Sequence, residues 1–150
     1  MGGVFIGTMS VLYTGGSFDC LHSGHIHFLM QCRRLVGEDG RVIVSLNTDD
    51  FIEKYKGVKP IFNYDERKEL LEQCEYVDEV IPNIGGADSK PAILQVNPGI
   101  VAIATDWAGK DYYKQMDFTQ KWLDDRGIVL AYLPYATVIS TTEIKRRLKG

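Results

Sequence analysis

Short apolar segments rich in β-branched residues alternate with amphipathic segments along this chain of 150 residues. The apolar runs predict strands at 11–14, 41–46, 79–81, 100–104 and 128–133. The amphipathic segments predict helices at 24–35, 49–55, 63–73, 90–96, 113–125 and 140–148. This alternation is typical of a single-domain α/β fold: a Rossmann-like, doubly wound parallel sheet of five strands with helices on both faces.

Two pairs of residues mark helix starts. Asn63 with Glu66, and Ser140 with Glu143, have the spacing of a capping box, and Gly127 is placed to end the helix before it.

In a doubly wound sheet, ligands bind beyond the carboxyl ends of the strands where the strand order reverses. We therefore expect the strands at 11–14 and 100–104 to flank a crevice, and Asp106 after the later strand to reach it.

The turn that follows the first predicted strand carries the most informative chemistry. It runs from Gly15 to His25, and its two histidines are His22 and His25. The first N–H groups of a helix have no helical partner and form an anion site, which the helix dipole strengthens. We expect Gly15 and Gly16 to let the chain bend there, and both imidazoles to face one phosphate-binding cavity.

The histidines of this turn allow a second interpretation. His22, His25 and His27 could form a metal cluster, but no Cys, Asp or Glu stands at the usual companion spacing. His27 falls on another helix face, so we expect it to be structural or exposed to solvent. Asp19 is placed to orient an imidazole or a substrate amine.

Composition narrows the range of partners. The net charge of −3 and the pI near 5.6 argue against a nucleic-acid-binding protein. The basic residues at 145–149 are read as cations favoured in the last turn of a helix. No run is long and apolar enough to span a membrane, so no membrane partner is expected.

Cysteine usage bears on the compartment. The three cysteines include no CxxC pair, which predicts free thiols and a reducing cytoplasm. Cys20 is read as a small buried apolar residue and not as a nucleophile. Residues 1–9 lack the features of a signal peptide and are expected to be an N-terminal extension or a remnant of expression.

The residues of this turn resemble the motif of a known family. Ser17-Phe18-Asp19 with His22-Ser23-Gly24-His25 resembles the signature of the HxGH nucleotidyltransferases, between a strand and a helix as in that family. The segments 76–82, 106–110 and 139–142 resemble the cytidylyltransferase branch, and most of all the glycerol-3-phosphate cytidylyltransferases. The resemblance covers about residues 10 to 148 and assigns 10–150 as the nucleotidyltransferase domain.

The resemblance implies an activity. Relatives join a nucleoside triphosphate to a phosphorylated small molecule and release pyrophosphate, with Mg²⁺ bound through the triphosphate. CTP and a phosphorylated alcohol or polyol such as glycerol 3-phosphate are the favoured substrates, and a homodimer is expected. Two alternatives stay open: adenylyl transfer from ATP to a sugar phosphate or other small-molecule phosphate, and a nucleotide-binding module without catalysis.

It also implies roles for individual residues. His22, His25 and Lys56 are implied to be catalytic. Lys54 and Arg67 are implied to bind a phosphate or the acceptor. The residues implied to bind the nucleotide are Gly16, Ser17, Phe18, Asp19, Gly24, Asp106, Ser140, Thr141 and Thr142.

Three segments depart from the pattern of the glycerol-3-phosphate cytidylyltransferases. Tyr135-Ala136-Thr137-Val138 stands where they carry Arg-Thr-Glu-Gly, so a phosphate-binding arginine is missing. Glu75 replaces an arginine, and Ala104-Thr105 replaces Gly-Asp before Asp106. These changes leave the acceptor and the base open, because they fall outside the first turn.

Overall fold

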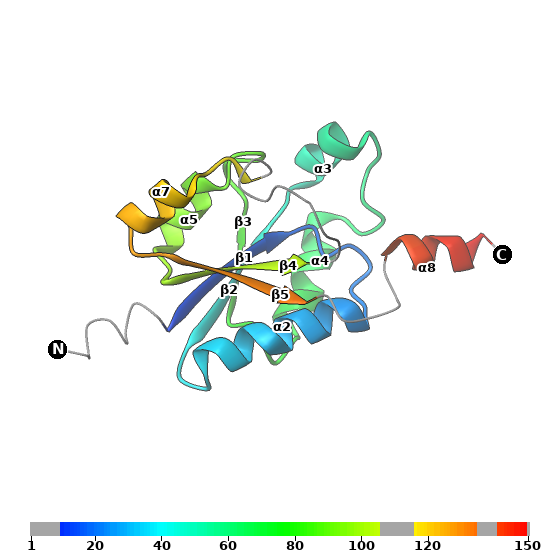
Figure 1. The fold of residues 1–150 in the computed structure, drawn as a ribbon. Helices are drawn as coiled ribbons and strands as arrows, with labels where there is room; N and C mark the ends of the chain where they lie inside the picture. Colours follow the sequence, from blue (N-terminus) through cyan, green and yellow to red (C-terminus); the bar gives the residue numbers. More distant parts are fainter. Residues whose placement is uncertain (1–9, 106–115, 135–140, 150) are drawn as a thin grey trace.

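The computed structural model describes residues 10–105, 116–134 and 141–149 (Figure 1). Residues 1–9, Asp106 and Ser140 lie outside the described residues, so the expectations placed on them stay predictions. The described strands are β1 (Val11–Gly16), β2 (Arg41–Leu46), β3 (Glu79–Pro82), β4 (Ile100–Thr105) and β5 (Val129–Pro134).

These strands form one parallel sheet in the order β3-β2-β1-β4-β5, which confirms the predicted fold class. The chain proceeds outward from β1 to β3 and then crosses back to place β4 on the other side of β1. The order therefore reverses between β1 and β4, where the sequence predicts the ligand crevice.

The described helices are α2 (Ser23–Val36), α3 (Asp49–Lys56), α4 (Tyr64–Glu72), α5 (Lys90–Val96), α7 (Gln120–Asp125) and α8 (Thr141–Leu148). The capping box of Asn63 and Glu66 is confirmed at the start of α4. Within the helix predicted at 113–125, residues 113–115 lie outside the described residues, Met116 is helical, and the helix is interrupted at 117–119. Thr119 caps α7 by accepting a hydrogen bond from the Trp122 N–H, and Phe118 before it packs in the core.

Side-chain alternation along β1 divides the core into two clusters. Leu12 faces the cluster that includes Leu29 of α2 and Leu71 of α4. Tyr13 faces the opposite cluster, with Ile93 of α5 and Leu123 of α7. Helices thus cover both faces of the sheet, as the near-continuous apolar strands require, and α8 stands apart from it (Figure 1). Among the described helices, none has the length and apolar character needed to cross a bilayer.

Candidate active site

A cavity of about 490 Å³ lies at the carboxyl ends of the central strands. Its lining includes Gly15 and Gly16 of β1, Ala102 and Ala104 of β4, and Asn47 just after β2. This volume is in the range of small-molecule sites. The predicted crevice is therefore present, at the reversal of strand order.

The glycine pair acts differently from the expectation. Gly15 and Gly16 are the last residues of β1, whereas the left-handed residues of the turn are Phe18 (φ +47°) and Cys20 (φ +53°). A Cβ on Gly16 would stand 3.0 Å from the Phe18 ring, and one on Gly15 would stand 3.3 Å from the Tyr13 hydroxyl oxygen. The glycines therefore supply space, and the bend is made by two non-glycine residues held in a strained conformation.

His22 and His25 build the start of α2. The Gly24 N–H donates to His22 Nδ1 at 3.0 Å, and the His22 N–H donates to His25 Nδ1 at 3.2 Å. This is a capping box made of two histidines, and it satisfies backbone donors at the helix start. The two rings stack with centroids 3.8 Å apart. His25 lines the cavity, but His22, which is 9% exposed, and Gly24 do not, so the expectation that both imidazoles face the cavity is wrong for His22.

These contacts set the protonation of the rings. Burial lowers the pKa of His22, and burial together with the neighbouring His22 lowers the pKa of His25 to about 3. Both rings are therefore neutral at pH 7. Because each Nδ1 accepts a hydrogen bond, the ring hydrogen is on Nε2. His25 thus lines the cavity as a neutral imidazole at the positive end of a helix.

This arrangement predicts how stability depends on pH. His25 binds a proton in the unfolded chain near its ordinary pKa of 6.5, but in the folded chain only near pH 3. Unfolding therefore takes up a proton between these values, and the free energy of unfolding falls by up to about 1.4 kcal/mol per pH unit as the pH drops. Denaturant titrations from pH 7 to pH 4 check this. In a His25→Gln variant the slope becomes shallower, and an unchanged slope contradicts the assignment.

Asp19 fastens the loop before α4 to the turn. Its two carboxylate oxygens accept hydrogen bonds from the backbone N–H groups of Ile61 at 2.7 Å and Phe62 at 2.9 Å. Asp19 is 8% exposed and lines the cavity. Its visible role is therefore to hold the loop that borders the site, and the expected role of orienting an imidazole or a substrate amine stays a prediction.

The structure places Arg67 outside the cavity, in contrast to the expectation that it binds a phosphate or the acceptor. Its side chain is 0% exposed and is not among the lining residues. Its guanidinium donates to the carbonyl oxygens of Phe62 and Ser17, each at 2.9 Å, and to Asp49 Oδ1 at 2.6 Å. A guanidinium so occupied does not reach a phosphate in the cavity, so in this structure Arg67 joins the turn, the loop and α3.

Of the two lysines predicted to lie at the site, the structure places one in the cavity lining. Lys56, the last residue of α3, lines the cavity, and Gly57 in the left-handed conformation ends the helix behind it. Lys54 is exposed on α3 and is not a lining residue, so the structure does not bring it to the site. Sequence reasoning missed two lining cations, Lys59 and Lys145.

The last helix also reaches the cavity. Thr142 in its first turn lines the cavity, whereas the side chain of Thr141 lies outside the described residues, and nucleotide binding by either residue stays a prediction. Lys145, one turn after Thr142, lines it too. The Lys145 ammonium acts to lower the pKa of the Cys20 thiol, although burial and Asp19 leave that pKa raised. Lys145 therefore lies near the histidine turn, and Cys20, which is half-buried, is not a thiolate nucleophile.

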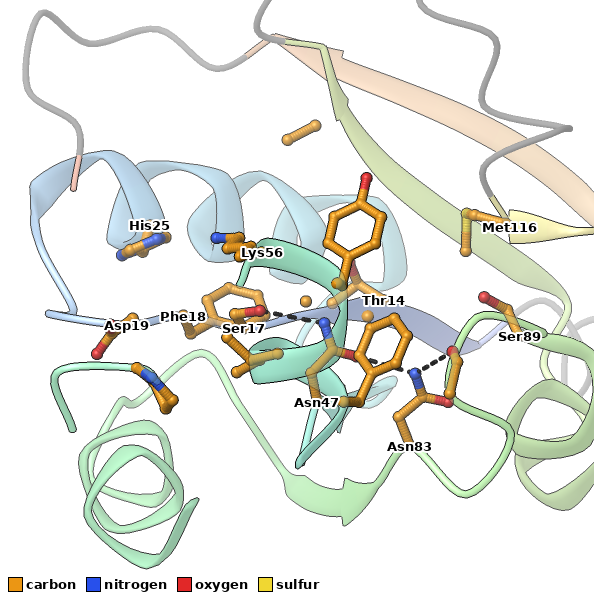
Figure 2. Close-up of a pocket in the computed structure, with 18 of the residues that line it drawn as sticks. Thr14, Ser17, Phe18, Asp19, His25, Asn47, Lys56, Asn83, Ser89 and Met116 are labelled. Atoms are coloured by element: carbon orange, nitrogen blue, oxygen red, sulfur yellow. Dashed lines mark hydrogen bonds between the residues drawn. The ribbon is translucent and has the colours of Figure 1, made fainter. Parts of the chain in front are cut away.

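A second missed feature is a row of hydrogen bonds across the floor of the cavity (Figure 2). Asn47 Nδ2 donates to Ser17 Oγ at 3.1 Å, and Asn83 Nδ2 donates to Asn47 Oδ1 at 2.9 Å and to the Gly86 carbonyl oxygen at 2.8 Å. The asparagines directly follow β2 and β3, a position that would have flagged them in the sequence.

Within the described ranges, no group of three or more His, Cys, Asp or Glu side chains is arranged to hold a metal ion. His27 is exposed, as expected.

Comparison with known proteins adds independent information. Residues 13–147 match the family described as cytidylyltransferase-like. The glycerol-3-phosphate cytidylyltransferase of Bacillus subtilis (strain 168) is 35% identical over 143 residues, which cover 95% of this chain and 99% of the relative. The FAD synthase of Thermococcus sibiricus is 33% identical over 135 residues, covering 90% and 89%. The crystal structure of the lipopolysaccharide core biosynthesis protein from Thermoplasma volcanium GSS1 has a TM-score of 0.65 and 25% identity, covering 86% and 98%.

Proposed function

The chain belongs to the cytidylyltransferase-like family and is a nucleotidyltransferase, and from this premise we propose that it transfers a cytidylyl group from CTP to a small polyol phosphate such as glycerol 3-phosphate. The observation that carries the proposal is the neutral His25 imidazole at the start of α2, in a cavity that Lys56 and Lys145 also line. Such a site suits a polyanion such as a triphosphate: the lysines and the helix dipole supply the positive charge, and the imidazole is neutral.

The reaction needs no covalent intermediate with the protein. An oxygen of the acceptor phosphate forms a bond to the α-phosphorus as the bond from that phosphorus to the bridging oxygen breaks, and pyrophosphate leaves. His25 donates from Nε2 to an α- or β-phosphate oxygen as charge builds there. Lys56 and Lys145 balance the β- and γ-phosphates, and the positive end of the α2 dipole favours the negative charge beside it.

Mg²⁺ enters this proposal as part of the nucleotide substrate. The one carboxylate among the described lining residues, Asp19, already accepts two backbone hydrogen bonds. A magnesium ion would therefore be held by triphosphate oxygens and water, which suits its preference for keeping several waters. Bound in this way, it neutralises phosphate charge. The expected homodimer and the cytoplasmic location stay predictions.

Lys145 offers a direct test of the phosphate end. A Lys145→Ala variant loses a charge-assisted contact worth about 1.5–3 kcal/mol, so kcat/KM for the nucleotide falls about 10–100-fold. Lys149→Ala is the matched control, because Lys149 follows the end of α8, is exposed and lines no part of the cavity. Steady-state kinetics at saturating acceptor measure the effect. Equal kinetics for the two variants would remove Lys145 from the proposal.

Adenylyl transfer is the second candidate, and the similarity to an archaeal FAD synthase favours it. FAD contains an adenylyl group. The name of this relative, FAD synthase, therefore indicates a product that contains adenine. Of the three departures from the glycerol-3-phosphate cytidylyltransferases, Glu75 and Ala104-Thr105 lie in the described ranges, and Tyr135-Ala136-Thr137-Val138 lies outside them.

The two candidates are separated by a pyrophosphate-release assay with CTP or ATP against glycerol 3-phosphate or flavin mononucleotide. The proposal expects turnover with CTP and glycerol 3-phosphate at a kcat/KM at least tenfold above the other pairs. Turnover with ATP and flavin mononucleotide alone replaces it with the second candidate. Nucleotide binding without turnover in any pair indicates a module that has lost catalysis.

A further inference from the structure

Two neutral residues, Ser89 and Met116, border the cavity on the side away from its catalytic cations. Figure 2 shows both of them across the cavity from His25 and Lys56. Ser89 directly precedes α5, and Met116 packs against the core cluster on that face of the sheet. We call Ser89 and Met116 together the far wall.

The far wall borders the part of the cavity that the nucleotide leaves free. The resemblance assigns the nucleotide to the histidine turn and to the start of α8, where Thr142 lines the cavity. Helix α8 follows β5 at one edge of the sheet, whereas Ser89 belongs to the segment that follows β3 at the opposite edge. The acceptor substrate is therefore the one that meets the far wall.

The two members of the far wall are joined from behind. The Ser89 N–H donates to the Met116 carbonyl oxygen at 3.2 Å. The ammonium of Lys90 donates to the carbonyl oxygen of Asp117 and pairs with Asp88 Oδ1 at 3.0 Å. The same Asp88 oxygen accepts the Lys90 N–H at 3.0 Å, so the lysine is fixed at its backbone and at its tip. Lys90 thus cross-links the start of α5 to the segment 116–118.

The residue that Lys90 holds has a strained backbone. Asp117 has a φ of +60°, in the left-handed region, and Phe118 after it is 4% exposed in the core. A non-glycine residue keeps such a conformation where contacts on both sides impose it. The Asp117 carboxylate is 70% exposed and 3.7 Å from the ammonium, so that ion pair is weak. The bond from Lys90 to the backbone carbonyl is therefore the contact that fixes the chain beside Met116.

We propose that Lys90 is a positioning residue for the acceptor: it holds Met116 against Ser89 and so sets the wall on which the carbon chain of the acceptor packs. This rests on the proposed function, which supplies the acceptor. Lys90 is not one of the described residues that line the cavity, so it acts through Met116. Without the cross-link the flexible Met116 side chain moves away, and acceptor binding weakens while the chemistry at His25 is unchanged.

Lys90→Leu tests this by removing the ammonium while keeping an apolar side chain. The KM for glycerol 3-phosphate rises about 3–10-fold, because only part of the lost charge-assisted bond is felt by the acceptor, and kcat and the KM for CTP change by less than about twofold. In Lys90→Arg, whose guanidinium can donate to the same carbonyl and carboxylate oxygens, the KM returns toward the wild-type value. A purely structural role would reduce the fraction of active enzyme, and so kcat, without raising one KM.

Lys121→Leu is the matched control. Lys121 pairs with Asp125 at 2.7 Å on the exposed face of α7 and lines no part of the described cavity, so the same substitution leaves both KM values as in the wild type. Asp117→Asn separates the backbone contact from the side-chain ion pair. Asparagine tolerates the left-handed conformation and keeps the carbonyl oxygen, so this variant also keeps the wild-type KM.

The methyl group of Met116 gives a readout that does not require turnover. Protein labelled with ¹³C at the methionine methyl groups is titrated with glycerol 3-phosphate in the presence of the α,β-methylene analogue of CTP, and a Met116→Leu variant identifies the signal. In the wild type the Met116 signal shifts to saturation. In Lys90→Leu the half-saturating concentration is about 3–10-fold higher, in step with the KM.

Each outcome bears on one of the two proposals. A wild-type acceptor KM in Lys90→Leu, or an equal rise in Lys121→Leu, overturns the inference and leaves the proposed function standing. Absence of turnover with every acceptor overturns the proposed function instead. The methyl titration then decides the inference by itself: weaker binding by Lys90→Leu than by the wild type supports it, and equal binding or no shift in the wild type overturns it.

Discussion

Replacing His25 by glutamine lowers kcat by about 10²–10³-fold and leaves the protein folded. Removing one preorganised donor from a site where charge builds in the transition state has an effect of this size. Glutamine is chosen because it is a natural residue at the third position of a capping box, where its carbonyl oxygen can accept the His22 N–H in place of His25 Nδ1. The start of α2 is thereby kept while the imidazole donor is lost.

Two further variants separate catalysis from helix capping. His25→Ala loses both the donor and the cap, so it lowers kcat and also the free energy of unfolding by about 1 kcal/mol. His22→Asn keeps a side-chain acceptor for the Gly24 N–H but removes the ring stacked on His25, so it lowers kcat with little change in stability. Steady-state kinetics and urea titrations measure the two effects. A His25→Gln enzyme with wild-type kcat would mean that the histidine pair is only a helix cap.

Replacing Arg67 by alanine lowers the free energy of unfolding by about 3 kcal/mol, which is about 6–12 °C in Tm for a chain of this length. The variant leaves the carbonyl oxygens of Ser17 and Phe62 without their donor and opens a void in a fully buried position. The loss lies at the low end for a buried ion pair, because the Asp49 side chain is 40% exposed and keeps contact with water.

Arg67→Met and Arg34→Ala complete this test. Methionine fills most of the void but restores no hydrogen bond, so it recovers only part of the loss in stability. Arg34 is exposed on α2, and its replacement changes stability by less than about 0.5 kcal/mol. Thermal and urea unfolding give the values. If Arg67 instead binds phosphate, Arg67→Met will raise the KM for the nucleotide at nearly wild-type stability.

The sequence was sufficient to predict the sheet because the signals are local. Each strand is a short β-branched run, and Asn63 with Glu66 marks a helix start by spacing alone. The position of the crevice followed from the same pattern, since alternating strands and helices imply a reversal of strand order next to β1. His25 and Thr142 could be placed in the cavity because each stands near the start of a predicted helix, whereas Lys56 was implied by the family resemblance.

What the sequence left open depends on contacts between distant segments. Arg67 is 50 residues from Ser17, and only the folded chain shows that its guanidinium is consumed by backbone and by Asp49. Lys145 belongs to a basic run that is typical of a helix end, and its reach into the cavity depends on how α8 sits. The pairing of Asn47 with Asn83 likewise requires that β2 and β3 be neighbours.

The most direct test of the central claim is to follow the α-phosphorus. CTP labelled with ³²P at the α-position is incubated with Mg²⁺ and glycerol 3-phosphate, and the labelled products and pyrophosphate are quantified for wild type and His25→Gln. The account predicts label in a cytidine diphosphate ester of glycerol, one pyrophosphate per ester, and a loss of about 10²–10³-fold in the variant. Label released only as CMP regardless of acceptor, or the same ester yield in both proteins, would contradict it.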